Sequence, residues 1–169
     1  MTIVSDLHLL AFGRIIHRYA AVESGVKIAL SGILRIPLAE AMITFEPYGA
    51  LDLKNVARSI AKERLKSELV EPFVCIVGDW FALNGLRNTI AHSRWTEGAR
   101  PGSIKPRSVN IREGRARWVG DGEEETDYTV EELNLKADSL HAVNERLKKF
   151  LHESGLSLVV EEMMAATSA

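Results

Sequence analysis

Apolar side chains that recur at steps of three and four residues constrain the fold of this chain more than any other feature. The pattern begins near the N-terminus and runs from about Leu7 to Leu34. Its positions are Phe12, Ile15, Tyr19, Val22, Val26, Ala29 and Ile33. This spacing places the apolar side chains on one stripe of a helix. The charged residues Arg14, His17, Arg18, Glu23 and Lys27 mostly fall on other faces. The pattern predicts one long amphipathic helix that other helices must cover.

Three more helices are predicted before residue 93. Pro37 can open a short helix over 37–45, and Asp52 can cap a third helix with Val56, Ile60 and Leu65 inward. Glu71-Pro72 marks the start of a fourth, which runs from Pro72 to about His92. The inward stripe predicted for the fourth helix is Phe73, Ile76, Val77, Trp80 and Phe81, followed by Asn84, Arg87 and Ala91.

The C-terminal half holds a hairpin and one more long helix. An insertion at about 104–120 reads as a two-stranded hairpin that turns at Glu113-Gly114. Thr129 is a suitable N-cap for a helix whose apolar positions include Leu133, Leu140 and Leu147, and Gly155 is a plausible stop. The tail, about 156–169, would add an edge strand or a short helix. These elements predict one domain over 1–169. Its expected fold is an all-α, up-and-down helical bundle with a small β-hairpin inserted before the last long helix.

Composition limits which ligands the protein can bind and in which cellular compartment it is expected to work. The net charge of −2 excludes a molecule that attracts nucleic acid over its whole surface, so polyanion binding would have to be local. The lone Cys75, in an apolar context, is expected to be buried and inert, which suits a reducing, cytoplasmic location. No signal peptide is recognised, and no stretch is expected to reach the length of a membrane span. The five histidines are dispersed, so no metal site is predicted.

The segment LRNTIAHSRW, residues 86–95, ends the fourth predicted helix with polar residues. Residues four apart share a helix face, so Asn88 lies beside His92. Arg87 continues the inward line through Trp80 and Asn84, where an unpaired charge costs several kcal/mol. Two interpretations stay open. Arg87 pairs with a carboxylate such as Glu23 or Asp79, with Asn88 and His92 closing the helix, or Arg87 faces a cleft.

The sequence RNTIAH, Arg87 to His92, resembles the Arg-x4–6-His motif of the HEPN superfamily (higher eukaryotes and prokaryotes nucleotide-binding). In that family a polar residue, often Asn, follows the arginine, and the motif lies near the end of a bundle helix. A second match, Arg146 to His152, has leucine after the arginine and is discounted. The resemblance in architecture covers about residues 5–155, whereas the specific motif is only six residues long.

The resemblance implies a metal-independent endoribonuclease without a cofactor, related to toxins or phage defence and working as a homodimer. The implied catalytic residues are Arg87, Asn88 and His92. His92 would act as general base or acid, Arg87 would clamp the phosphate, and Asn88 would orient the imidazole or donate to phosphate. Some HEPN toxins carry a tyrosine that a partner antitoxin modifies. That tyrosine lies three residues after the motif histidine, and here the residue at this position is Trp95. Control by modification of a tyrosine is therefore not predicted, although another protein partner stays open.

A local excess of positive charge supports an RNA partner. Seven basic and two acidic residues lie between Arg94 and Arg117, which gives a net charge of +5. The predicted RNA-binding residues are Arg94, Arg112, Arg115 and Arg117. The alternative is that the arginines are solvated or face the acidic segment 121–127. Trp95 and Trp118 are expected to pack within the protein rather than stack on bases.

Two other functions stay open. One is a non-catalytic helical dimerisation or binding module, with an interface on the first and last long helices. The other is a bundle that binds a nucleotide or small anion through Arg87 and the hairpin without chemistry.

Overall fold

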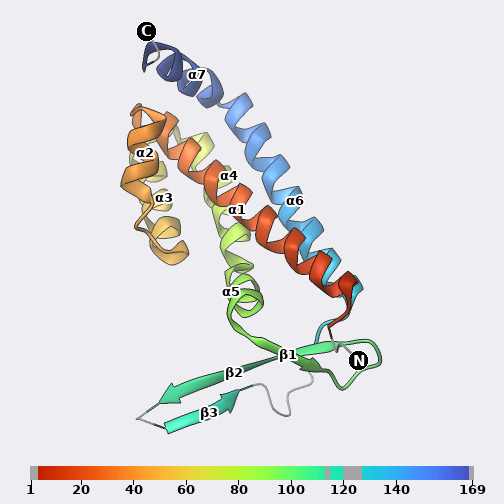
Figure 1. Ribbon diagram of the computed structural model, residues 1–169. Coiled ribbons are helices and arrows are strands. Elements are labelled where there is room, and N and C mark those ends of the chain that lie inside the picture. Colours follow the sequence, from red (N-terminus) through yellow and green to blue (C-terminus); the bar gives the residue numbers. More distant parts are fainter. Residues whose placement is uncertain (1–3, 113–114, 120–126, 168–169) are drawn as a thin grey trace. The chain divides into compact units, whose positions relative to one another are not determined.

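The computed structural model describes the backbone of residues 4–112, 115–119 and 127–167, and the side chains of 108–126 and 166–169 lie outside the description. Within these ranges the chain forms seven helices and three strands (Figure 1). The helices are α1 (Asp6–Leu34), α2 (Leu38–Phe45), α3 (Ala50–Arg64), α4 (Ser67–Ala82), α5 (Asn84–His92), α6 (Val130–Glu153) and α7 (Leu156–Thr167). The strands are β1 (Arg94–Glu97), β2 (Ile104–Arg112) and β3 (Arg115–Val119). The predicted all-α bundle with a small hairpin before the last long helix is confirmed.

Contacts between residues divide the chain into two compact units. The first, here called the sheet unit, contains residues 1–18 and 85–139. The second, called the helical unit, contains residues 19–84 and 140–169. Helices α1 and α6 each contribute their N-terminal part to the sheet unit and the rest to the helical unit.

Helix α1 follows the predicted pattern closely. Ser5 precedes it, and the Ser5 hydroxyl lies 2.8 Å from Nδ1 of His8 in the first turn. His8 is buried, and this burial lowers the pKa of its imidazole. The predicted stripe positions from Phe12 to Ala29 are all buried, while Ile33 is half-buried. The spacing of apolar residues therefore identified the face of α1 that packs.

Lys27 departs from the predicted surface position on α1. Its side chain is only 8% exposed, and its ammonium lies 2.9 Å from Glu46 and 3.4 Å from Glu23. Glu46 follows α2, and Glu23 lies one turn earlier on α1. The long aliphatic stem of lysine can pack in a core when its charge is paired. Lys27 therefore connects α1 with the end of α2.

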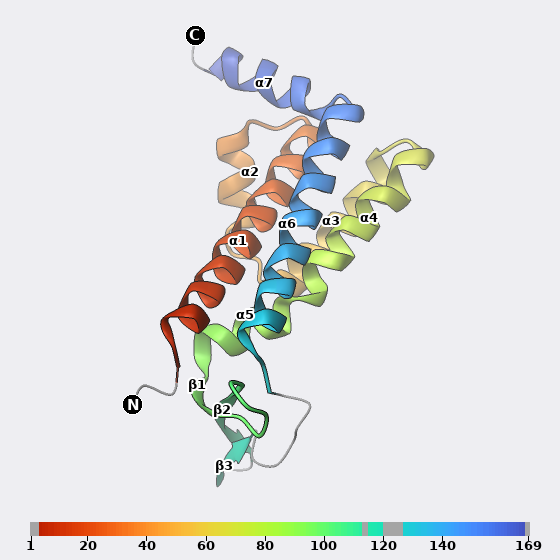
Figure 2. The same cartoon turned by 90° about the vertical axis from the view of Figure 1, so that its right-hand side faces the viewer.

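Aromatic pairs in the core of the helical unit join α1 with α4 and α4 with α6. The rings of Tyr19 and Trp80 lie 5.2 Å apart, and those of Phe73 and Phe150 lie 5.3 Å apart. Helices α1 and α6 lie side by side and run in the same direction (Figures 1 and 2). A Cβ at Gly25 on α1 would lie 2.7 Å from a methyl group of Leu147, so this glycine permits close approach of the two helices.

Two predicted helix starts are corrected. The N-cap of α3 is Gly49, and Asp52 lies inside its first turn. The buried residues of α3 are Leu53, Ala57 and Ala61, which lie four apart on one face, whereas Val56, Ile60 and Leu65 are half-buried. Helix α4 begins at Ser67 rather than at Pro72, which lies inside it. Pro72 has no N–H to donate within the helix, and α4 continues through it into the buried residues that begin at Phe73.

Cys75 is exposed, which contradicts the expectation of a buried thiol. The buried residues of α4 are Phe73, Ile76, Val77 and Trp80, and their spacing leaves position 75 on the opposite side. The Cys75 thiol donates to Glu71 at 3.4 Å, and this hydrogen bond raises the pKa of the thiol. A raised pKa keeps the thiol protonated and poorly nucleophilic.

Among the described residues, one helical stretch is long and apolar enough to cross a membrane by length and composition. It is Ser67–His92, which joins α4 and α5, with a mean hydropathy of 1.4 in its most apolar window. The expectation that no stretch reaches this length is therefore wrong by that measure. A core helix that is mostly buried passes the same test, and 22% of this window is buried. The length criterion alone does not indicate a membrane span.

The sheet is antiparallel with the order β1-β2-β3 (Figure 2). Strands β2 and β3 form the predicted hairpin, with Arg112 opposite Arg115. Its expected turn at Glu113-Gly114 lies outside the described residues. Strand β1 was not predicted, and it pairs with β2 so that Arg94 lies opposite Arg107. The chain thus passes from α5 almost directly into a sheet.

The boundaries of α6 agree with the predicted capping residues. The backbone N–H of Thr129 donates to the Glu132 carboxylate at 2.8 Å, and the N–H of Glu132 donates to the Thr129 hydroxyl at 3.2 Å. This reciprocal pair is a capping box. Gly155 has a φ of 74° where α6 ends, a conformation that favours glycine. The tail forms a helix, α7, rather than an edge strand.

Candidate functional site

Helix α5 carries the three residues that the sequence singled out. Arg87 and Asn88 are half-buried, and His92 is exposed as the last residue of the helix. Not one residue of α5 is buried, in contrast to α4. The polar residues of α5 are therefore not held in place by a surrounding apolar core.

A break at Leu83 separates α5 from α4, where one continuous helix was predicted. The N–H of Leu83 bonds to the carbonyl of Trp80 at 3.2 Å, which closes α4 with a tighter turn. Asn84 accepts a hydrogen bond from the Tyr19 hydroxyl at 3.0 Å. The inward line through Trp80 thus ends at Asn84, and the prediction that Arg87 continues the buried stripe is wrong. Arg87 is instead partly open to solvent.

Arg87 and Asn88 are in direct contact. Nη1 of Arg87 donates to Oδ1 of Asn88 at 2.9 Å. The guanidinium has five N–H donors, and the Asn88 amide keeps its own two. Arg87 also takes part in a further interaction. This pair presents several hydrogen-bond donors on one short helix, as an anion-binding site requires.

The two carboxylates considered as partners of Arg87 have other partners. Asp79 pairs with Arg146 at 2.6 Å, and Glu23 pairs with Lys27 at 3.4 Å. Both ion pairs lie within the helical unit. Each of these carboxylates thus has a cationic partner within the helical unit, and the interpretation of Arg87 as a further partner stays a prediction.

His92 leads directly into the basic strand β1. Arg94 is exposed and lies two residues beyond His92, so their Cα atoms are at most about 7 Å apart. The backbones of Arg112, Arg115 and Arg117 belong to β2 and β3, and Asn110 lies opposite Arg117. The side chains of these three arginines lie outside the described residues. Of the predicted RNA-binding side chains, the structure thus shows Arg94.

Arg100, another member of the basic stretch, has acidic partners. Its guanidinium bonds to both carboxylate oxygens of Glu132, at 2.7 and 2.8 Å, and donates to the backbone carbonyl of Asp127. The hydrogen bond from Arg100 lowers the pKa of Glu132 to about 2. The carboxylate that pairs with Arg100 thus lies outside the segment 121–127, and within that segment the guanidinium meets the backbone carbonyl of Asp127.

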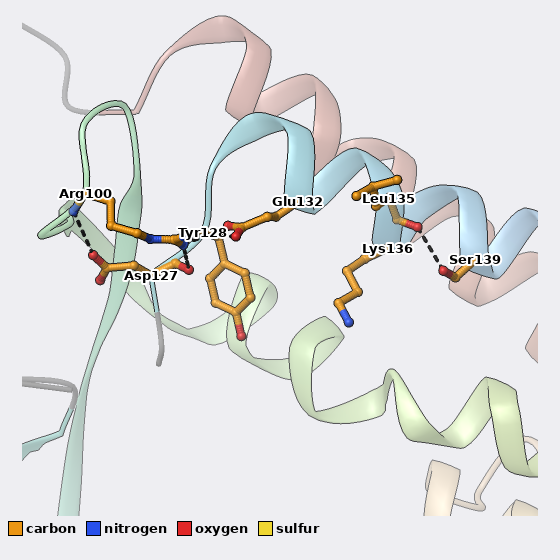
Figure 3. A pocket seen from close by; sticks show the side chains of 7 residues that line it. All are labelled: Arg100, Asp127, Tyr128, Glu132, Leu135, Lys136 and Ser139. Atoms are coloured by element: carbon orange, nitrogen blue, oxygen red, sulfur yellow. Dashed lines mark hydrogen bonds and ion pairs between the residues drawn. The ribbon is translucent and has the colours of Figure 1, made fainter. Parts of the chain in front are cut away.

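A pocket of about 610 Å³ adjoins this ion pair in the sheet unit. It is lined by Arg100, Asp127, Tyr128, Glu132, Leu135, Lys136 and Ser139 (Figure 3). Tyr128 and Lys136 project to the same side, whereas Arg100 points toward Glu132. Sequence reasoning missed this pocket because its walls come from residues up to 39 positions apart. The sequence feature nearest to it is Thr129, the predicted N-cap of α6.

Asp127 shapes the loop beside the pocket. One of its carboxylate oxygens accepts hydrogen bonds from the backbone N–H groups of Ala99 and Arg100 and lies 3.2 Å from the Ser103 hydroxyl. A Cβ at Gly98 would lie 2.2 Å from that hydroxyl, so only glycine fits there. These hydrogen bonds hold the loop in place, so the residues at the Arg100 end of the pocket serve to stabilise the fold.

Trp95 packs within the sheet unit, as expected. Its ring lies 4.7 Å from that of Phe12 and 6.1 Å from that of Tyr128. Trp118 lies outside the described side chains. Among the described residues no group of three or more His, Cys, Asp or Glu side chains could hold a metal ion.

Comparisons with known proteins identify no relative: no family model, curated protein or solved structure matches this chain.

Proposed function

We propose that this protein is a metal-independent endoribonuclease of the HEPN type, with its catalytic residues on α5. The observation that carries the proposal is the placement of Arg87, Asn88 and His92. They lie on one short helix without a buried residue, with Arg87 bonded to Asn88 and His92 exposed. Core packing does not account for these polar side chains, whereas phosphate chemistry uses all three.

The proposed reaction is an internal transfer at one phosphodiester. The 2′-hydroxyl oxygen attacks the adjacent phosphorus, and the bond from phosphorus to the 5′-oxygen breaks. His92 takes the proton of the 2′-hydroxyl or gives a proton to the leaving 5′-oxygen, since imidazole exchanges protons near neutral pH. Arg87 balances the charge that grows on the phosphoryl oxygens. The products are a 2′,3′-cyclic phosphate and a 5′-hydroxyl.

One histidine cannot hold both roles in the same step, so a homodimer that brings two copies of His92 to one cleft is part of the proposal. A cytoplasmic toxin or phage-defence protein, with a second protein that restrains it, would suit this activity. These points rest on the resemblance of RNTIAH to the family motif.

The test is incubation of purified protein with labelled single-stranded RNA in EDTA, followed by analysis of the product ends. We expect cleavage by the wild type and loss of at least about a hundredfold in His92→Ala. His152→Ala is the matched control, because His152 is also exposed near the end of a helix. It should cleave like the wild type. Absence of cleavage by a folded wild type would contradict the proposal.

A second candidate function, a non-catalytic dimerisation module, is favoured by exposed leucines in the sheet unit. Leu7 and Leu10 on α1 are 61% and 53% exposed, and Leu135 on α6 is 61% exposed. Large apolar side chains that are exposed to solvent are typical of contact surfaces when they form one patch. Sedimentation of wild type and a Leu7→Glu, Leu10→Glu variant tests this function. A dimer that persists in the variant would contradict an interface there.

A further inference from the structure

The pocket of the sheet unit has no part in the proposed cleavage of RNA. Its volume of about 610 Å³ lies within the range of about 300–1,000 Å³ that is typical of small-molecule sites. At one end Arg100 and Glu132 hold each other through two hydrogen bonds, and the other end is lined by Tyr128, Leu135, Lys136 and Ser139 (Figure 3). The Ser139 hydroxyl already donates to the backbone carbonyl of Leu135 at 2.9 Å. A ligand would therefore contact chiefly Tyr128, Leu135 and Lys136.

Lys136 supplies a positive charge at this end of the pocket. It lies one turn after Glu132 on α6, a position at which lysine commonly pairs with the glutamate. Here both carboxylate oxygens of Glu132 bond to Arg100, and one of them also accepts the N–H of Thr129. The side chain of Lys136 is exposed and projects to the same side as that of Tyr128 (Figure 3). The structure thus directs the ammonium group to the pocket and not to Glu132.

Tyr128 supplies an aromatic wall that is held in position. Its backbone forms two hydrogen bonds with Ile104, at 2.9 and 2.8 Å, and its ring lies 6.1 Å from the ring of Trp95. Burial raises the pKa of the Tyr128 hydroxyl, so this group stays protonated at neutral pH. Leu135, which is 61% exposed, adds an apolar side chain to the same pocket. A fixed ring and an exposed leucine beside a cation suit a ligand that is both aromatic and anionic.

We propose that this pocket binds a small aromatic anion, with the ring of the ligand on Tyr128 and Leu135 and its carboxylate or phosphate on Lys136. Aromatic rings pack on one another in offset or edge arrangements, and an ammonium group binds carboxylate and phosphate as a point charge. An aliphatic anion would lose the ring contact, and a neutral aromatic molecule would lose the charge contact. The proposal does not depend on the ribonuclease, because none of the three side chains belongs to α5.

Isothermal titration calorimetry of the full chain tests this binding with naphthoate, an aromatic carboxylate, and adenosine 5′-monophosphate, an aromatic phosphate. At least one of them should bind, and inorganic phosphate should bind about tenfold more weakly because it lacks the ring. Lys136→Met should raise the Kd about tenfold or more, the loss expected for a charge-assisted hydrogen bond. Lys148→Met is the matched control, because Lys148 is also exposed on α6 but does not line the pocket. It should bind both probes like the wild type.

Two substitutions at Tyr128 separate the ring from the hydroxyl. Tyr128→Leu removes the ring and should raise the Kd about tenfold, whereas Tyr128→Phe keeps the ring and should bind much like the wild type. Circular dichroism verifies folding, and Lys136→Met carries the test alone if Tyr128→Leu does not fold, since position 136 is exposed. Failure of both probes to bind the folded wild type, or equal affinities for the wild type and Lys136→Met, would overturn the proposal. Inorganic phosphate that binds as tightly as the probes would overturn the aromatic part of the site, because charge alone would then account for binding.

Discussion

The chain contains two segments in which an arginine precedes a histidine at similar spacing, and the structure places them in different surroundings. Arg87 and His92 lie on α5, which has no buried residue. Arg146 and His152 lie on α6, next to Leu147 and Phe150 in the core of the helical unit. Arg146 is paired with Asp79 at 2.6 Å. Arg87 donates a hydrogen bond to its polar neighbour Asn88 at 2.9 Å.

The difference shows what spacing leaves undetermined. Both segments satisfy the same pattern of an arginine and a histidine, but on α6 residues between the arginine and the histidine are buried in the core. On α5 the residues between Arg87 and His92 contribute nothing to a buried core. A polar group that packing does not require is the better candidate for chemistry.

The largest loss of stability should come from a substitution in the buried face of α6. Leu147 is 1% exposed and contacts Gly25, so Leu147→Ala should lower the free energy of unfolding by about 2–5 kcal/mol. Ile90→Ala on α5, where Ile90 is half-buried, should lower it much less. Urea unfolding of both variants measures the difference. Equal losses would mean that α5 is as much a part of the core as α6.

RNA cleavage should depend on Arg87 and not on Arg146. Arg87→Ala should reduce cleavage about 10²- to 10³-fold, because a positioned donor to the developing charge is lost. Arg146→Ala should cleave RNA at the rate of the wild type. Single-turnover cleavage of labelled RNA measures both rates, with circular dichroism to verify folding. A similar loss in the two variants would remove the distinction between the segments.

Acid should weaken the pair that Arg100 forms. The pKa of Glu132 is lowered to about 2 in the folded state, chiefly by the hydrogen bond from Arg100. A carboxyl with a lowered pKa stabilises the fold above its ordinary pKa, and this contribution is lost as pH falls toward 2. The wild type should therefore lose Tm between about pH 5 and pH 2, and Glu132→Gln should lose less over that range. Parallel curves of Tm against pH for the two proteins would show that Glu132 does not contribute to stability.

The smallest effect should be that of the surface pair. Arg146 and Asp79 are each about half exposed, so their interaction should contribute at most about 1 kcal/mol. A double-mutant cycle of Arg146→Ala and Asp79→Ala, run at low and high salt, measures this coupling. A larger value that salt does not reduce would mark this pair as structurally essential.

Much of the fold follows from local patterns in the sequence. The stripe of α1, the cap at Thr129 and the stop at Gly155 were predicted because each depends on neighbouring residues. The break at Leu83 and strand β1 were missed, since the apolar pattern continues past the break and β1 is defined by its partner β2. Within the site, the sequence placed Arg87, Asn88 and His92 on one helix, but neither the hydrogen bond of Arg87 to Asn88 nor the pairing of Arg94 with Arg107 was predicted. That pairing depends on strand register.

The parallel contact of α1 with α6 has a consequence for synthesis of the chain. Arg14 bonds to Asn134 and Arg18 to Asp138, so each pair joins residues 120 positions apart. A ribosome adds about 5–20 residues per second, so α1 leaves it about 6–24 s before its partner on α6 exists. During that interval the apolar stripe of the first helix is open to chaperones and to other nascent chains.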